Sequence, residues 1–384
     1  MSSHRYSLVN ALLKASIKLF PSLLPIFLGE LLLVHIFLIL GKERLSIEFF
    51  AYIMLEATSL WFSGKLSDIW SRRKVLLLIH SSTLVTLILS YFFRNDLKRP
   101  FLLLLASGIL FNPGPAARAI LIDNFKSTII KTSNNFYSKL HLTETRLIGI
   151  SWIVQYLPWI FGPFFILLSE YQRLFLIIGL LLFSIPLLYY QLSDSLENSV
   201  LSKHRSFIKN FNKAPLILSG LLFAQLVFFT TFDKVDFLKN SSNLFSLIGI
   251  GALLGTIFSL FFRKTPHLSV VTYSYAFGMM LSFTNFLYYY FPTNEFLDTG
   301  LSLIHLAAVG GFYLPFVFDI IISKSNAQHR GTLFACAEVV QSLAAVLGVI
   351  AMTLIGDNPI FLFATTTILF IIALSITAKH GTIS

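Results

Sequence analysis

Apolar residues run through this chain in continuous stretches of about twenty, separated by short polar segments. A helix needs about 20 apolar residues to cross a bilayer, and within lipid its backbone polar groups must be satisfied internally. A transmembrane β-barrel would instead show alternating segments of about ten residues. The pattern therefore predicts twelve transmembrane helices, at residues 19–41, 45–63, 75–93, 99–122, 147–169, 172–192, 214–232, 244–262, 268–290, 298–322, 331–355 and 358–378.

Composition narrows the class of protein further. Of the 384 residues, 55% are hydrophobic and 12% are charged, against roughly 25% charged in an ordinary soluble domain. A soluble globule of this size still needs a charged surface, so a cytosolic enzyme, a disordered chain and a secreted disulfide scaffold are excluded. The single cysteine, Cys336, forms no internal disulfide. The fold class predicted is an all-α polytopic membrane protein without a cleavable signal peptide.

The net charge of +11 would suggest nucleic acid in a soluble protein, but here it reports topology. With the N-terminus placed inside, 20 of the 29 Lys and Arg residues fall in inside segments and 8 in outside loops. Basic residues favour the cytoplasmic side of a membrane. We therefore expect a multi-pass protein of the bacterial inner membrane with both termini cytoplasmic, and no nucleic-acid partner.

The longest polar interruption, residues 193–213, divides the twelve spans into six and six. This predicts an N-terminal six-helix bundle over 1–192, a cytoplasmic linker, and a C-terminal six-helix bundle over 214–384. Two pseudo-symmetric bundles with a substrate path between them are the layout of many secondary transporters. We expect a monomer.

The strongest local motif is GKLSDIWSRRKV, residues 64–75, in the short turn between spans two and three. Gly64 lets two helices approach closely, Asp68 suits a helix N-terminus, and Arg72 and Arg73 anchor the turn to the inner membrane surface. The alternative is an ordinary basic loop that contains an isolated aspartate.

This segment resembles the signature loop of the major facilitator superfamily, Gly-x-x-x-Asp-Arg-x-Gly-Arg-Arg/Lys. The resemblance implies that Asp68 engages the start of span eleven near Gly331 and stabilises one alternating-access state. Two positions depart from the pattern: Ile69 stands where the family has Arg, and Ser71 where it has the second Gly.

Two further stretches resemble the lysophospholipid-transporter branch of that superfamily. Residues 108–123 carry Pro115 and Arg118, and residues 310–348 begin with a Gly-Gly-Phe-x-x-Pro stretch. Arg118 is expected in the last turns of span four, within reach of the interface, and Asp123 at the end of that span.

Ionisable groups inside spans are costly and are therefore candidates for function. The candidates for a substrate or proton site are Glu30, Glu56, Arg118, His305 and Glu338. They fit proton coupling or cation recognition, and equally a neutral acid in a helix–helix hydrogen bond or a structural salt bridge. In span five, Gln155 and Pro158 suggest a kinked packing helix.

Motifs of other classes are missing from the sequence. It has no P-loop, no His-Glu-x-x-His zinc motif, no His-x4-Asp acyltransferase motif and no Gly-x-Ser-x-Gly elbow. We therefore expect no enzyme, no cofactor and no metal. The sequence favours a secondary active transporter for a small organic or lipid-like solute, with proton coupling open. The alternatives are a lysophospholipid flippase-like transporter and a transport-inactive receptor or assembly protein.

Overall fold

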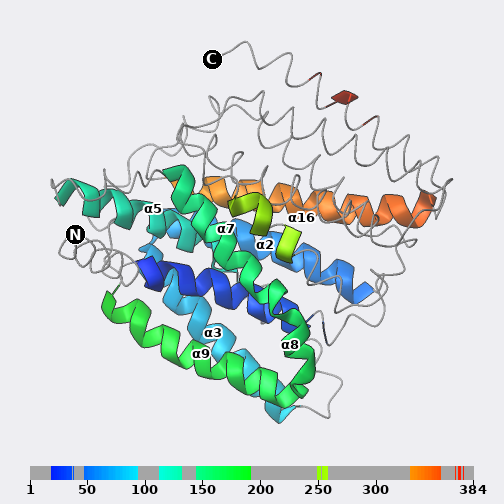
Figure 1. The fold of residues 1–384 in the computed structure, drawn as a ribbon, viewed down its shortest axis with the longest axis horizontal. Coiled ribbons are helices and arrows are strands. Elements are labelled where there is room, and N and C mark those ends of the chain that lie inside the picture. The colour runs from blue at the N-terminus through cyan, green and yellow to red at the C-terminus, as the bar shows by residue number, and fades with distance from the viewer. Residues whose placement is uncertain are drawn as a thin grey trace, which may run out of the picture.

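A computed structural model describes eight helices and several short pieces of the chain (Figure 1). The residues described are 19–36, 38, 47–93, 112–131, 144–191, 249–251, 253–257, 329–355, 368, 371–372 and 375. In these parts the secondary structure is helical and no strand is present. Predicted spans seven, nine and ten and the 193–213 linker lie outside the described residues, so the division into two bundles stays a prediction.

The helices follow the predicted spans closely. They are the first helix Leu19–Ile36, α2 (Ile47–Ile69), α3 (Arg72–Phe92), α5 (Gly114–Lys131), α7 (Glu144–Ile160), α8 (Gly162–Leu167), α9 (Glu170–Gln191) and α16 (Arg330–Ile355). Four stretches are long and apolar enough to cross a membrane by length and composition: Leu19–Ile36, Arg72–Phe92, Arg146–Leu167 and Glu170–Tyr190.

Two helices continue beyond the predicted ends of their spans: α2 ends at Ile69 rather than residue 63, and α5 also extends further. Span four was expected to end at residue 122, but α5 continues to Lys131. The expectation took the charge of Asp123 as the end of the apolar run. In the structure this carboxylate is buried and paired with arginines, so the helix has no reason to end there.

Two antiparallel helix pairs organise the described part. The end of α2 meets the start of α16, and the two helices pack along their length, which places a helix from late in the sequence against one from early in it (Figure 1). The α3 and α9 helices pair likewise: Tyr91 near the end of α3 contacts Tyr171 near the start of α9. An apolar cluster that includes Leu28, Leu87 and Leu181 joins the first helix to this second pair.

The described helices are apolar outside and partly polar inside. Phe175, Leu182, Phe183 and Tyr190 of α9 are exposed, whereas arginine, histidine and serine side chains of α3 and α5 are buried. A soluble protein avoids so much exposed apolar surface, and lipid supplies the matching solvent.

A break in the fifth predicted span separates α7 from α8. α7 ends at Ile160, Phe161 lies in a turn, and α8 starts at Gly162 with Pro163 in its first turn. Proline lacks the N–H that would continue the helical ladder, which explains the kink. The helical stretch at 249–257 packs here, because a Cβ at Gly249 would lie 2.7 Å from the backbone nitrogen of Ile160.

Candidate functional site

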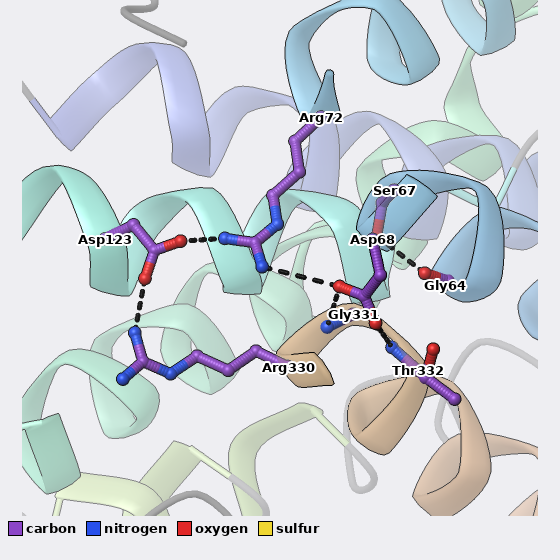
Figure 2. A network of polar contacts seen from close by, with 8 residues as sticks. All are labelled: Gly64, Ser67, Asp68, Arg72, Asp123, Arg330, Gly331 and Thr332. Atoms are coloured by element: carbon purple, nitrogen blue, oxygen red, sulfur yellow. Dashed lines mark hydrogen bonds and ion pairs between the residues drawn. The ribbon is translucent and has the colours of Figure 1, made fainter. Parts of the chain in front are cut away.

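Two polar networks occupy the contact between α16 and the N-terminal helices. We call them the Asp68 network and the Glu30 network. The first comprises Asp68, Arg72, Asp123 and Arg330 together with the backbone N–H groups of Gly331 and Thr332 (Figure 2). The second comprises Glu30, Gln155, Trp159, Arg118 and Glu338.

The carboxylate of Asp68, in the last turn of α2, accepts hydrogen bonds from the first turn of α16. Gly331 N–H donates to Oδ1 at 3.0 Å, and Thr332 N–H donates to Oδ2 at 2.7 Å. The first N–H groups of a helix have no partner within the helix, and the helix dipole favours an anion there. Asp68 therefore binds the start of α16 by both hydrogen bonding and charge (Figure 2).

Arg72 extends the Asp68 network to α5 and back to α16. One guanidinium nitrogen lies 3.4 Å from Asp68, and another pairs with Asp123 of α5. The other carboxylate oxygen of Asp123 pairs with Arg330 at the start of α16. Both arginine side chains are buried, so this closed chain of ion pairs satisfies charges that would otherwise be costly.

Glycine makes this close approach possible. A Cβ at Gly64 would collide with the Cβ of Ala335 and would lie 2.5 Å from the Gly331 carbonyl oxygen. A Cβ at Gly331 would lie 2.7 Å from the Gly64 carbonyl oxygen and 2.8 Å from Asp68. Small residues allow membrane helices to bring their backbones together. Gly64 and Gly331 thus set the separation at which Asp68 reaches its two N–H donors.

The two departures from the signature pattern have different structural settings. Ser71 is the N-cap of α3, and its hydroxyl accepts from the N–H of Lys74 at 3.3 Å. Serine is a favoured N-cap residue, so the serine has a local role. Ile69, which replaces the family's arginine, is exposed.

The second arginine of the motif does not join the Asp68 network. Arg73 donates to the Tyr189 carbonyl oxygen at 3.5 Å, and its guanidinium lies 5.9 Å from the centroid of the Tyr189 ring. It therefore ties the start of α3 to the end of α9. Gly64, Asp68 and Arg72 come together at α16, whereas Arg73 lies on the other side of α3.

The Glu30 network connects the first helix to α7. Gln155 Nε2 donates to one Glu30 oxygen at 2.6 Å, and Trp159 Nε1 donates to the other at 2.8 Å. Gln155 and Trp159 are four residues apart on α7 and so lie on one face of it. Glu30 is thus held by two neutral donors.

Arg118 of α5 links this carboxylate site to α16. Its guanidinium donates to Gln155 Oε1 through Nη2 and pairs with Glu338 through Nη1. It also lies over the ring of Trp152, 4.6 Å from the centroid. The Arg118 side chain is only 2% exposed and is directed into the helix contact. Partners on three sides hold it inside.

Space for the Arg118–Glu338 pair comes from a glycine at the start of α5. A Cβ at Gly114 would lie 3.0 Å from Glu338 Oε2 and 3.2 Å from Arg118 Nη1. This gives the glycine of the Pro-Gly-Pro stretch a packing role next to the ion pair.

The two remaining candidates, Glu56 and His305, are not part of the hydrogen bonds and ion pairs described above. Glu56 of α2 is partly buried, and its charge repels that of Glu30, but within the described residues it has no hydrogen bond or ion pair. His305 lies outside the described residues. The described part also contains no group of three or more His, Cys, Asp or Glu placed to hold a metal ion.

The two networks differ in charge balance. The Asp68 network has two carboxylates and two guanidinium groups. In the Glu30 network the guanidinium of Arg118 pairs with Glu338, while Glu30, and Glu56 beside it, form no ion pair among the described residues. Along α5 the networks are five residues apart, or about 7 Å at 1.5 Å per residue. A fully ion-paired contact thus lies about one and a half turns from carboxyl groups that form no ion pair among the described residues.

Sequence reasoning missed four of the participating residues. Asp123 was expected at a helix end and Gln155 in a packing helix, and neither Arg330 nor Trp159 was singled out. The spacing of Arg118 and Asp123 on one helix was the available signal, but their partners lie 220 and 207 residues away.

The fold defines the class of protein first. Over nearly its whole length the chain has the fold of solved transporters of the major facilitator superfamily, and four of its described helical stretches are long and apolar enough to cross a membrane. No family model and no curated relative matches the sequence.

The particular likenesses are to solved structures. The human organic anion transporter MFSD10 (TETRAN) is 12% identical with a TM-score of 0.67, over 94% of this chain and 99% of that one. A bacterial homologue of the iron transporter ferroportin in an outward-facing state is 15% identical with a TM-score of 0.68, over 96% of this chain and 99% of that one. A bacterial ferroportin homologue in an outward-facing state with soaked iron is 15% identical with a TM-score of 0.67, over 95% of this chain and 98% of that one. At these identities the likeness shows the fold.

Proposed function

We propose that this protein is a secondary active transporter that moves a small solute across a membrane by alternating access. The observation that carries the proposal is the pair of hydrogen bonds that Asp68 accepts from the first turn of α16. It joins helices from opposite ends of the sequence at one end of their contact. Because Asp68 and its N–H donors lie at helix ends, water can take over these hydrogen bonds when the helices separate. Such a contact suits a passage that closes and reopens.

The proposed architecture has two six-helix halves, residues 1–192 and 214–384, with both termini and the Asp68 network at the cytoplasmic face of a bacterial inner membrane. The basic residues gathered on the inside segments support this orientation. The likeness to organic anion and iron transporters supports a small solute as substrate.

Proton coupling is the second part of the proposal. Arg118 is paired with Glu338, whereas Glu30 and Glu56 form no ion pair among the described residues, and uncompensated charge inside a membrane is costly. Protons from the aqueous phase remove that cost. We infer that Glu30, with Glu56 beside it, takes up and releases protons during the cycle.

The proposal is tested by flux into proteoliposomes under an imposed pH gradient. The probes are ferrous iron, an aromatic organic anion, an organic cation and a lysophospholipid, which also separates the lipid-transport alternative. We expect gradient-driven uptake of one probe, lost in Asp68→Ala and retained in the neighbouring Lys65→Gln. Uptake by none of the probes, together with unchanged alkylation of Cys336 in their presence, would support the receptor or assembly alternative instead.

A further inference from the structure

Gln155 lies between Glu30 and Arg118, two oppositely charged groups of the Glu30 network that attract each other. Its Nε2 donates to Glu30 at 2.6 Å, and its Oε1 accepts from Arg118. Within the described residues no ion pair joins Glu30 directly to Arg118. A neutral amide thus occupies the position where a carboxylate–guanidinium pair could form.

The orientation of this amide is fixed by its neighbours. A reversed amide would place NH2 against the guanidinium N–H groups and a carbonyl oxygen against the Glu30 carboxylate, and both contacts would be repulsive. The second Glu30 oxygen is held by Trp159 Nε1 at 2.8 Å. The Gln155–Trp159 pair of α7 therefore presents two neutral donors to Glu30 and one acceptor to Arg118.

We propose that Gln155 is a positioning residue that keeps Glu30 apart from Arg118, so that Arg118 stays paired with Glu338 while Glu30 exchanges its proton. The role of proton exchange in transport rests on the proposed function, whereas the separation of Glu30 from Arg118 does not depend on it. A direct Glu30–Arg118 pair would hold the proton site in its ionised form. It would also draw Arg118 away from α16, to which it is bound through Glu338.

Several charged or titratable groups surround Glu30, and the test must account for them. Arg118 faces it from α5, Glu56 from α2 and Tyr156 from α7, while Glu338 of α16 acts through Arg118. The substitution of Gln155 leaves all of them in place. A change in the titration of Glu30 then reports on the loss of Gln155, and its direction separates the spacer role from that of a hydrogen-bond donor.

Trp159 provides a direct optical readout, because its indole N–H donates to Glu30. The experiment is a tryptophan fluorescence titration against pH of the purified, substrate-free full chain in detergent micelles. The Trp159 signal is the difference from Trp159→Phe. We expect a titration in the wild-type protein that is absent in Glu30→Gln. In Gln155→Leu its midpoint should fall by about 1 to 3 pH units, the usual effect of an opposite charge brought close.

Gln341 supplies the matched control. It is another buried glutamine of a membrane helix, in α16, and Gln341→Leu should leave the midpoint unchanged. Gln155→Met serves as a second variant of similar volume if Gln155→Leu does not purify. An unchanged or raised midpoint in both Gln155 variants overturns the inference, because Gln155 would then be only a hydrogen-bond donor. A titration that persists in Glu30→Gln overturns it as well.

Failure of this inference is distinguishable from failure of the proposed function. If proteoliposomes show proton-driven flux but the Gln155 variants keep the wild-type midpoint, the transporter stands and the spacer role is wrong. If the midpoint shifts as expected but no probe is transported, the spacer role stands and the transport proposal is wrong.

Discussion

A carboxylate at position 68 fits its surroundings in a way that the corresponding amide does not. Both of its oxygens accept backbone N–H groups of α16, whereas asparagine would direct its own NH2 at one of those donors. The negative charge is also stabilised by the helix N-terminus and by Arg72. Position 68 therefore requires the negative charge of aspartate as well as its shape.

From this we predict that Asp68→Asn destabilises the protein. The loss of one charged hydrogen bond and of the ion pair should cost about 1–3 kcal/mol. Thermal unfolding of the purified protein in detergent would show a lower midpoint temperature. Lys65→Gln, which removes an exposed charge one turn earlier on α2, should leave that temperature nearly unchanged.

Gly64 offers a second prediction at this scale. In Gly64→Ala the new methyl group collides with Ala335 and the Gly331 carbonyl, so α2 and α16 must separate. Overpacking of this kind typically costs about 1–3 kcal/mol. The single thiol, Cys336, is half-buried on α16 next to Ala335 and reports the separation. We expect maleimide to alkylate it roughly tenfold faster.

The control for that substitution is Gly179→Ala in α9. A Cβ at Gly179 would meet no atom within 4 Å. Alanine favours helix over glycine, so stability should be unchanged or slightly higher, and Cys336 alkylation should match the wild type. Equal alkylation rates in the two alanine variants would argue that Gly64 does not set the helix separation.

At the scale of elements, α5 and α16 carry their charges in the same order along the chain. Along α5 a cation is followed by an anion, Arg118 and Asp123, and along α16 a cation is followed by an anion, Arg330 and Glu338. In an antiparallel pair each cation then faces an anion. A shift of either helix along its axis would break both ion pairs, so the charges fix the register.

A double-mutant cycle on Asp123 and Arg330 tests this arrangement. Asp123→Asn alone leaves Arg72 and Arg330 buried with less compensation, and Arg330→Gln alone weakens one side of Asp123. The double variant should be more stable than the sum of the single effects predicts, with a coupling energy on the order of 1–3 kcal/mol. Denaturant unfolding of all four proteins gives the value, and additive effects would exclude a direct coupling.

At the scale of the whole molecule, the two networks divide the tasks of the proposed cycle. The ion-paired Asp68 network holds the end of α2 to the start of α16, and the Glu30 network, with Glu56 beside it, holds the carboxyl groups proposed to exchange protons. Arg118 and Asp123 lie on the same helix, so movement of α5 against α16 alters both networks at once.

We predict that Glu30→Gln uncouples transport from the pH gradient. The neutral side chain keeps a similar shape but cannot carry a proton, so solute exchange at equal pH should continue while gradient-driven accumulation is lost. Proteoliposomes carrying the transported probe would show this as a flat pH profile. Accumulation that persists at the wild-type level would place proton coupling elsewhere in the chain.

The sequence predicted much of the fold and less of the site. The all-α class is confirmed by the structural neighbours, and the described helices match the apolar runs. Glu30, Arg118 and Glu338 were recognised as candidates because a charge is conspicuous within an apolar run. Gln155 was not, since an uncharged amide in a kinked helix shows nothing of its two charged neighbours.

By itself the sequence determined that this chain is a helical membrane protein, because lipid selects each span by its own length and polarity, whatever its neighbours are. Only the tertiary structure decided that Arg118 pairs with Glu338, that Asp123 is shared by Arg72 and Arg330, and that Gln155 separates Glu30 from Arg118. Ion pairs depend on which helices touch and in what register. Those contacts join residues up to 220 positions apart, and no local pattern encodes them.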